Sequence, residues 1–200
     1  MFAWCAMNRI VAGLLLATVL PIAGIAQTED GTVFPDFEAG RLTYDGASGR
    51  FIMEDVRYKR DDHQVKADLA EHDSLNFTRG LWNLSRNVEF RASNVTMNCE
   101  SAELFLGEAG LERATVFGDP VTIRNEGKWE FEGSAPRVEY VAETALLKLS
   151  GGVRLETVNG QINSESLVYD LVNDTIEASP GDEPVQFLYD FVSPGEDEGT

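Results

Sequence analysis

The alternation of apolar and polar residues between Arg41 and Ala178 limits this chain to a narrow range of folds. Segments such as Val95–Cys99, Val121–Arg124 and Val153–Glu156 change character at every step, which is the pattern of strands with one buried face. Gly, Asn and Asp interrupt these segments at short intervals. No segment has a sustained helical periodicity, and 101–111, the nearest to one, is predicted as strand and turn. The pattern predicts an all-β protein of many short strands.

An internal repeat groups these strands into pairs. Residues 82–106 align with 147–171 without a gap, and 8 of the 25 aligned positions are identical. The shared pattern is Leu-Ser-x-x-Val, then a turn, then Asn-x-Glu-Ser. A weaker copy begins near Leu42. Repeats at a fixed spacing favour stacked antiparallel strand pairs over a closed barrel.

The alternation also predicts which side chains face inward. Charged residues such as Glu89, Lys148 and Arg154 take outward positions. The inward positions are apolar and include Phe90, Met97, Phe131, Leu149, Leu155 and Ile162. A rolled sheet of this kind either closes around a core or stays open along one seam as a groove, and the sequence is compatible with both.

Glycine and proline predict where strands end. We expect Gly118-Asp119 to close one strand and Pro120 to begin the next, because proline has no N–H for a strand ladder. We expect Gly151-Gly152 to form a turn between strands.

Composition excludes several classes of protein. With 16 Lys+Arg and 34 Asp+Glu the formal charge is −18, so the chain lacks the basic surface that nucleic-acid binding needs. A hydrophobic content of 43% is too high for a disordered chain. The 200 residues are enough for one domain.

The first residues resemble an export signal. Arg9 precedes an apolar stretch from Ile10 to Leu20, and small residues at Gly24 and Ala26 follow. We expect residues 1–26 to be a signal peptide cleaved after Ala26, with an uncleaved membrane anchor as the alternative. Cleavage would remove Arg9 alone among charged residues, which leaves 15 − 34 = −19.

The two flanks of the strand-rich region differ from it in composition. Residues 27–40 are predicted to be a flexible lead-in and 41–178 the β-domain. Residues 179–200 combine a Pro-Gly linker, a β-prone patch at Val185–Val192, and an acidic tail predicted to be disordered. The patch is expected to be a last edge strand or a pairing strand for another molecule.

No catalytic or metal-binding motif stands out. His72, between Glu71 and Asp73, is interpreted as part of a solvated strand end, and His63 as part of a polar turn. After cleavage Cys99 is the sole cysteine, and we interpret it as a buried small apolar residue. We therefore predict no cofactor, no metal and no enzymatic activity.

A series of short motifs resembles the OstA-like repeats of lipopolysaccharide transport proteins. The resemblance covers about residues 64–178, and its motifs follow one another in the order found in the family. It is closest to the soluble LptA type, and the membrane-anchored LptC type is also similar. Arg86 stands where the family has Gly, and 41–62 resemble an added strand pair. The motifs are Val65–Asp73, Leu84–Phe90, Gly118–Ile123, Gly133–Tyr140, Leu149–Leu155 and Ile162–Asp170.

The resemblance implies an open β-jellyroll with an apolar lumen that holds the acyl chains of lipid A. It implies a periplasmic protein that bridges the inner and outer membranes with LptC-like and LptD-like partners and associates head to tail with itself. Alternation combined with the family's lumen gives ten candidate lipid-binding residues: Val65, Phe90, Met97, Leu104, Ile123, Phe131, Val138, Leu149, Leu155 and Ile162.

Two other functions fit the residues. One is an exported β-scaffold or assembly protein with a closed core and no lipid ligand. The other is a glycan-active enzyme, which needs two facing carboxylates in a cleft. Because the chain is strongly acidic, binding of an anionic lipid would have to come from burial of acyl chains, at ~0.8 kcal/mol per buried CH₂.

Overall fold

A computed structural model of the chain describes residues 36–74 and 76–189, which belong to a unit spanning 34–200. In this part of the chain every regular element is a β-strand, and no helix is long and apolar enough to cross a membrane. The strands are β1 Asp36–Glu38, β2 Arg41–Asp45, β3 Arg50–Arg60, β4 His63–His72, β5 Gly80–Ala92, β6 Val95–Gly107, β7 Gly110–Asn125, β8 Phe131–Val141, β9 Leu146–Thr157, β10 Gly160–Asp170, β11 Thr175–Ser179 and β12 Gln186–Tyr189.

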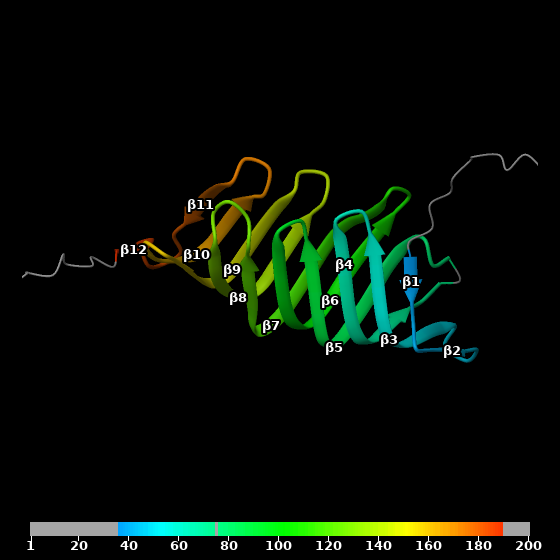
Figure 1. The fold of residues 1–200 in the computed structure, drawn as a ribbon. Helices are drawn as coiled ribbons and strands as arrows, with labels where there is room; N and C mark the ends of the chain where they lie inside the picture. Colours follow the sequence, from blue (N-terminus) through cyan, green and yellow to red (C-terminus); the bar gives the residue numbers. More distant parts are fainter. Residues whose placement is uncertain (1–35, 75, 190–200) are drawn as a thin grey trace, which may run out of the picture. The chain divides into compact units, whose positions relative to one another are not determined.

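The strands form one antiparallel sheet in which each strand from β3 to β10 pairs with its neighbours in the sequence. Both ends of the sheet have the same design. At one end β1 and β2 each pair with part of β3, and at the other β11 and β12 each pair with part of β10. Figure 1 shows the long strands side by side in chain order, joined by tight hairpins. The predicted all-β fold of stacked antiparallel pairs is confirmed.

A line of bulges crosses the middle of the sheet. All six consecutive strand pairs from β4–β5 to β9–β10 shift register near their midpoints, for example between Ser85 and Val88 in β5. A β-bulge bends its strand and increases the local twist. Because the bulges are aligned, they crease the whole sheet, and the strands form a trough whose two rims are rows of hairpin turns (Figure 1).

The bulges keep both halves of each strand facing the same interior. In β6 the buried positions are odd before the bulge, as at Met97, and even after it, as at Leu104. The extra residue at the bulge therefore shifts the buried positions from odd to even residue numbers, and the apolar face of the strand stays inside. Without it, half of the strand would turn its apolar side chains to solvent.

This arrangement corrects two predictions about strand ends. Gly118-Asp119-Pro120 does not separate two strands, because β7 runs through it and the tripeptide forms the β7 bulge. Gly151-Gly152 is not a turn but the bulge of β9, with positive φ at both residues. Glycine and proline are common at bulges as well as in turns, so composition alone did not distinguish the two.

Both flanks also contribute strands. Residues 36–38, which the sequence placed in the lead-in, form β1 and pair with Arg57–Lys59 of β3. The β-prone patch at 185–192 supplies β12, which pairs with β10 of the same chain. The predicted signal peptide at 1–26 and the tail from 190 lie outside the described residues.

Arg86 occupies the position of a glycine in the repeated pattern. Arg86 and Asn87 form the β5 bulge with φ of 67° and 50°, and 65 positions later Gly151 and Gly152 form the β9 bulge with φ of 90° and 91°. Left-handed backbone costs a residue with a Cβ about 1–2 kcal/mol. The Asn87 amide donates to the Asp68 carboxylate at 2.6 Å and fixes the bulge to β4.

We expect Arg86→Gly to stabilise the protein by about 0.5–1 kcal/mol, because glycine adopts positive φ without strain, partly offset by its greater freedom when unfolded. Gly151→Ala at the matching bulge should destabilise by a similar amount. Urea unfolding of both variants tests this, and a loss of stability in Arg86→Gly would contradict it.

Candidate functional site

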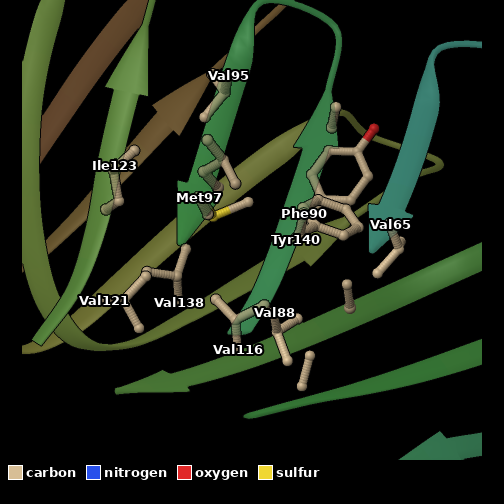
Figure 2. Close-up of a cluster of buried hydrophobic side chains, with 14 of the residues drawn as sticks. Val65, Val88, Phe90, Val95, Met97, Val116, Val121, Ile123, Val138 and Tyr140 are labelled. Carbon is tan, nitrogen blue, oxygen red and sulfur yellow. The ribbon is translucent and has the colours of Figure 1, made fainter. Parts of the chain in front are cut away.

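The interior of the trough is one continuous apolar cluster. Figure 2 shows side chains from β4 to β8 converging there, with Phe90, Met97 and Ile123 among them. All ten candidate residues predicted from the sequence belong to this cluster, and each is at most 7% exposed. They are Val65, Phe90, Met97, Leu104, Ile123, Phe131, Val138, Leu149, Leu155 and Ile162.

The two rims of the trough come close enough for contacts between side chains. The first rim is the row of hairpins after β3, β5, β7 and β9, and the second rim is the row after β4, β6, β8 and β10. Neighbouring hairpins on one rim are tied by backbone hydrogen bonds, such as Glu126 N–H to Asn94 O at 3.0 Å and Leu171 N–H to Ala145 O at 3.1 Å. Each rim is therefore a continuous band.

His63 and Tyr140 form one bridge between the rims. His63 begins β4 at the first rim and Tyr140 ends the inward face of β8 at the second, and the His63 Nε2 and Tyr140 Oη atoms lie 2.9 Å apart. His63 adjoins the polar turn at Asp61 and Asp62, as predicted, but its side chain is only 14% exposed and points into the seam rather than to solvent. Burial, followed by the charge of Asp62, raises the pKa of the Tyr140 phenol to about 12.

Asn125 and Tyr169 form a second bridge further along the trough. The Asn125 amide, at the end of β7, donates to the Tyr169 hydroxyl at 3.0 Å and to the Trp129 carbonyl at 2.6 Å. The Tyr169 hydroxyl donates in turn to Asp174 at 2.6 Å. Burial and this hydrogen bond to Asp174 raise the pKa of Tyr169 well above its usual value.

The apolar interior is therefore enclosed by different forces on different sides. Along the strands it is enclosed by backbone pairing, which is extensive. Across the rims it is enclosed by packed apolar side chains and by these two bridges, whose hydrogen bonds have a net value of about 1 kcal/mol each. Among the described residues no strand pairing joins the two rims, so the seam is the side of the trough that can open without breaking the sheet.

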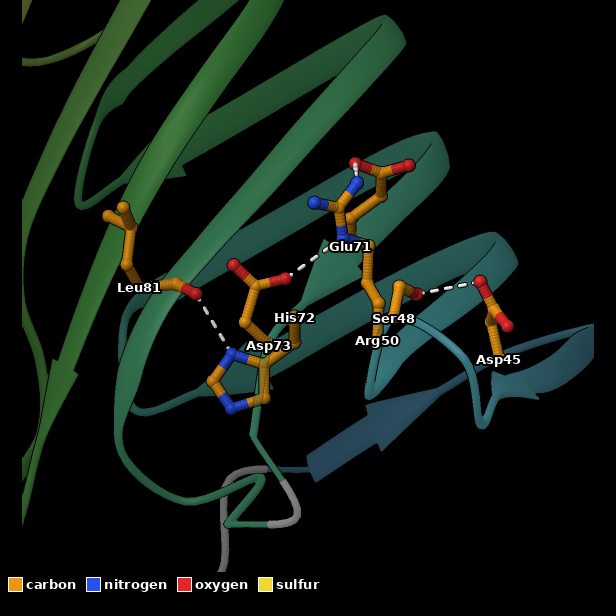
Figure 3. Close-up of polar contacts among 7 residues, drawn as sticks. All are labelled: Asp45, Ser48, Arg50, Glu71, His72, Asp73 and Leu81. Carbon is orange, nitrogen blue, oxygen red and sulfur yellow. Dashed lines mark hydrogen bonds and ion pairs between the residues drawn. The ribbon is translucent and has the colours of Figure 1, made fainter.

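An aromatic stack closes the end of the interior near β1. The Trp82 ring lies between His72 and Phe37, with centroid distances of 4.4 Å to each. Figure 3 shows His72 pointing toward Leu81, whose carbonyl lies 2.8 Å from Nδ1. Nε2 lies 3.0 Å from the Asn76 carbonyl.

His72 is 2% exposed, so its interpretation as part of a solvated strand end is wrong. Its neighbours differ: Glu71 and Asp73 bind Arg50 on the outer surface (Figure 3). Residues adjacent in a strand face opposite ways, so the apparent Glu-His-Asp cluster is divided between two faces of the sheet. Among the described residues no group of His, Cys, Asp and Glu is arranged to hold a metal ion.

The opposite end of the interior contains a cavity of about 500 Å³. Ile162 of the interior lines it, together with Trp129 from the β7–β8 turn and Phe187 from β12. Its remaining lining is Lys128, Asp174, Ile176, Ala178 and Val185. This cavity is mostly apolar and lies beside β12, which pairs with β10 at the edge of the sheet.

Cys99 packs against the cluster from a half-buried position, and its Sγ lies 3.6 Å from the Val88 carbonyl. Burial raises the pKa of this thiol to about 12, so the thiolate that would react is scarce at neutral pH.

These features define an all-β protein with a creased open sheet around a continuous apolar interior. A family model described as LptA/(LptD N-terminal domain) LPS transport protein matches residues 64–175. Because the match covers more than half of the chain, the protein belongs to this lipopolysaccharide transport family, and the predicted OstA-like resemblance is confirmed. The match begins at β4, so β1 to β3 lie before it.

A solved structure has a similar fold. It is LptH, described as the LptA homologous periplasmic component of the lipopolysaccharide transport device from Pseudomonas aeruginosa. The TM-score is 0.54 at 16% sequence identity, with 63% of this chain and 93% of LptH covered. At this identity the likeness concerns the fold. No curated protein matches the chain.

The residues that bridge the rims were not predicted from the sequence. Tyr140 was noted only as the end of a family motif, and Asn125 was not singled out. The available signal is that the tyrosines interrupt otherwise aliphatic inward positions: Tyr140 and Tyr169 each end the inward face of a strand. A buried tyrosine hydroxyl requires a partner, and from these positions at the second rim one is reached across the seam on the first rim.

Tyr140→Phe should reduce the loss of stability at alkaline pH. The folded pKa of about 12 exceeds the usual 10, so the stabilisation is complete below pH 10 and is lost as pH rises toward 12. The variant should be about 1 kcal/mol less stable at pH 8 but show a shallower decline above pH 10. Urea unfolding between pH 8 and 11.5 tests this, with Tyr44→Phe, an exposed tyrosine, as the control. An unchanged alkaline slope would contradict the assignment.

Proposed function

We propose that this protein is a periplasmic lipopolysaccharide carrier that shields the acyl chains of lipid A in the trough. The observation that carries the proposal is the continuous apolar interior beneath a seam that no strand pairing crosses among the described residues, in a member of the lipopolysaccharide transport family. An acyl chain entering between the rims would replace side-chain contacts of similar polarity. The sugar and phosphate head group would stay in water above the seam.

The interior acts on lipid through burial rather than charge. Its lining is apolar, while charged residues such as Lys66 and Glu89 pair with each other on the outer face at 2.8 Å. Each buried CH₂ contributes ~0.8 kcal/mol, so a few acyl chains outweigh the repulsion between an anionic lipid and an acidic chain. Separation of the rims would break the His63–Tyr140 and Asn125–Tyr169 bridges.

The carrier would form part of a bridge from the inner to the outer membrane. Both ends of the sheet present short strands at their edges, β2 and β12, in which every residue is exposed. Such edges accept strands from other proteins. The partners proposed are an LptC-like inner-membrane protein, an LptD-like outer-membrane protein and further copies of this chain arranged head to tail. A cleaved signal peptide at 1–26 would direct export to the periplasm.

One observation favours the alternative of a scaffold with a closed core. The ten candidate residues are buried against one another, at 0–7% exposure, as they would be in a core that never opens. The two functions differ in whether the interior admits lipid, and this difference can be measured directly.

Photo-crosslinking in the periplasm of a lipopolysaccharide-bearing host distinguishes the two functions. We expect a benzophenone side chain at Phe131 or Phe90 to crosslink lipopolysaccharide, because both side chains point inward. The neighbouring outward positions Glu132 and Arg91 are matched controls and should not crosslink. Folded protein without crosslinks at the inward positions would support the scaffold.

Lipid binding should depend weakly on salt and strongly on acyl content. We expect the affinity to change less than about threefold between 0.05 and 0.5 M NaCl, where a phosphate-binding surface would lose far more. Removal of acyl chains from the lipid should reduce affinity at least tenfold, in line with ~0.8 kcal/mol per CH₂. Fluorescence titration with intact and underacylated lipid A measures both, and a steep salt dependence would indicate recognition of the phosphates instead.

A further inference from the structure

The last strand of the sheet is short, and its side chains are exposed. β12 has four residues, which pair with Gly160–Asn163 of β10, while β11 covers the other half of the same edge. All four β12 residues are exposed, with Phe187 at 49%, Leu188 at 52% and Tyr189 at 62%. By contrast, Ile176 and Ala178 of β11 pack against the core cluster.

β12 covers two features of the sheet, a backbone edge and one end of the interior. It covers the backbone of Gly160–Asn163, which would otherwise be an open half-edge of the sheet. Its Phe187, with Val185 just before it, also forms one wall of the 500 Å³ cavity where the interior reaches Ile162. Displacement of β12 would expose the strand edge and open this end of the interior at the same time.

The close fit of β12 on β10 depends on Gly160. A Cβ at this position would overlap the Leu188 carbonyl oxygen, and Gly160 has a φ of 145°. The contact is therefore a specific backbone pairing between the two strands.

We propose that β12 is a displaceable cap, which leaves β10 when the β1–β3 end of a second copy pairs with that half-edge. This proposal rests on the proposed head-to-tail association and adds its regulation. A free chain keeps both its edge and its cavity covered. In an assembly, this end of the interior opens only when a second copy is paired there, so that the interior of one copy continues into that of the next.

Charge favours the β1–β3 end of a second copy as the occupant. Residues 160–189 contain six Asp and Glu and no Lys or Arg. Residues 36–60, which form the β1–β3 end, contain five Lys and Arg and five Asp and Glu, so this end has no net charge. Pairing of unlike ends therefore avoids the repulsion that two acidic β10–β12 ends would experience.

The exposed residues at the two ends are also similar in kind. β2 presents Leu42 at 55% and Tyr44 at 53% exposure, and β12 presents Phe187, Leu188 and Tyr189. An apolar strand of a second copy could replace β12 with side chains of the same character, so the exchange preserves the apolar contacts at this edge.

Locking β12 tests the proposal in the full-length exported chain. Gln161 and Leu188 are directly opposite in the β10–β12 register, so Gln161→Cys with Leu188→Cys allows a disulfide between the strands. In the exported chain Cys5 is removed with the predicted signal peptide, and the half-buried Cys99 has a raised thiol pKa that keeps it out of the exchange. We expect the oxidised form to self-associate at least about tenfold more weakly than the same protein reduced, measured by sedimentation velocity.

Releasing β12 should have the opposite effect. Leu188→Pro removes a backbone N–H and fixes φ within β12, whereas Leu188→Ala, the matched control, keeps the backbone intact. We expect self-association of Leu188→Pro to be about tenfold tighter than that of the alanine control. Circular dichroism and urea unfolding verify that both variants fold.

The proposal is wrong if the oxidised and reduced chains self-associate equally, or if the proline and alanine variants do. A chain that is monomeric in every form also contradicts it. Crosslinking at Phe131 in the same proteins reports lipid binding separately. Lipid binding without an effect of β12 refutes the cap alone, whereas β12-dependent association without lipid binding refutes the carrier function.

Discussion

The fold depends on the alignment of bulges across the middle of the sheet. A flat antiparallel sheet of this size would expose one apolar face to water, at ~25 cal/mol per Å². The bulges at Arg86-Asn87, Gly118–Pro120 and Gly151-Gly152 lie in register across the sheet. Together they bend the sheet so that its apolar face packs against itself. The interior, the two rims and the seam between them all result from this crease.

The crease also explains which parts of the fold were predictable. Period-two alternation identifies inward residues on either side of a bulge, so Phe90, Met97 and Leu155 were assigned correctly to the buried cluster. The bulge itself shifts the alternation by a residue, which made β7 appear as two strands separated at Pro120. A local pattern records the direction of each side chain but not whether a break in the pattern bends a strand or ends it.

Long-range polar contacts could not be predicted for a different reason. His63 meets Tyr140 at a separation of 77 residues, and Asn125 meets Tyr169 at 44. These pairs exist only because the crease brings the two rims together, so nothing adjacent in the sequence marks them. His72 was misjudged because its charged neighbours suggested solvent, whereas it alone turns inward to stack on Trp82. The family resemblance indicated the fold but not these side chains.

The pairing of every long strand with its neighbours in the sequence makes the structure extendable. Strands lie ~4.8 Å apart, so each additional hairpin lengthens the sheet by roughly 10 Å without altering the contacts of distant strands. β1 to β3 precede the residues that match the family model, and β2 and β3 form a strand pair within 41–62. Gain or loss of a hairpin can therefore change the length of such a sheet, and of the apolar interior along it, in steps of one strand pair.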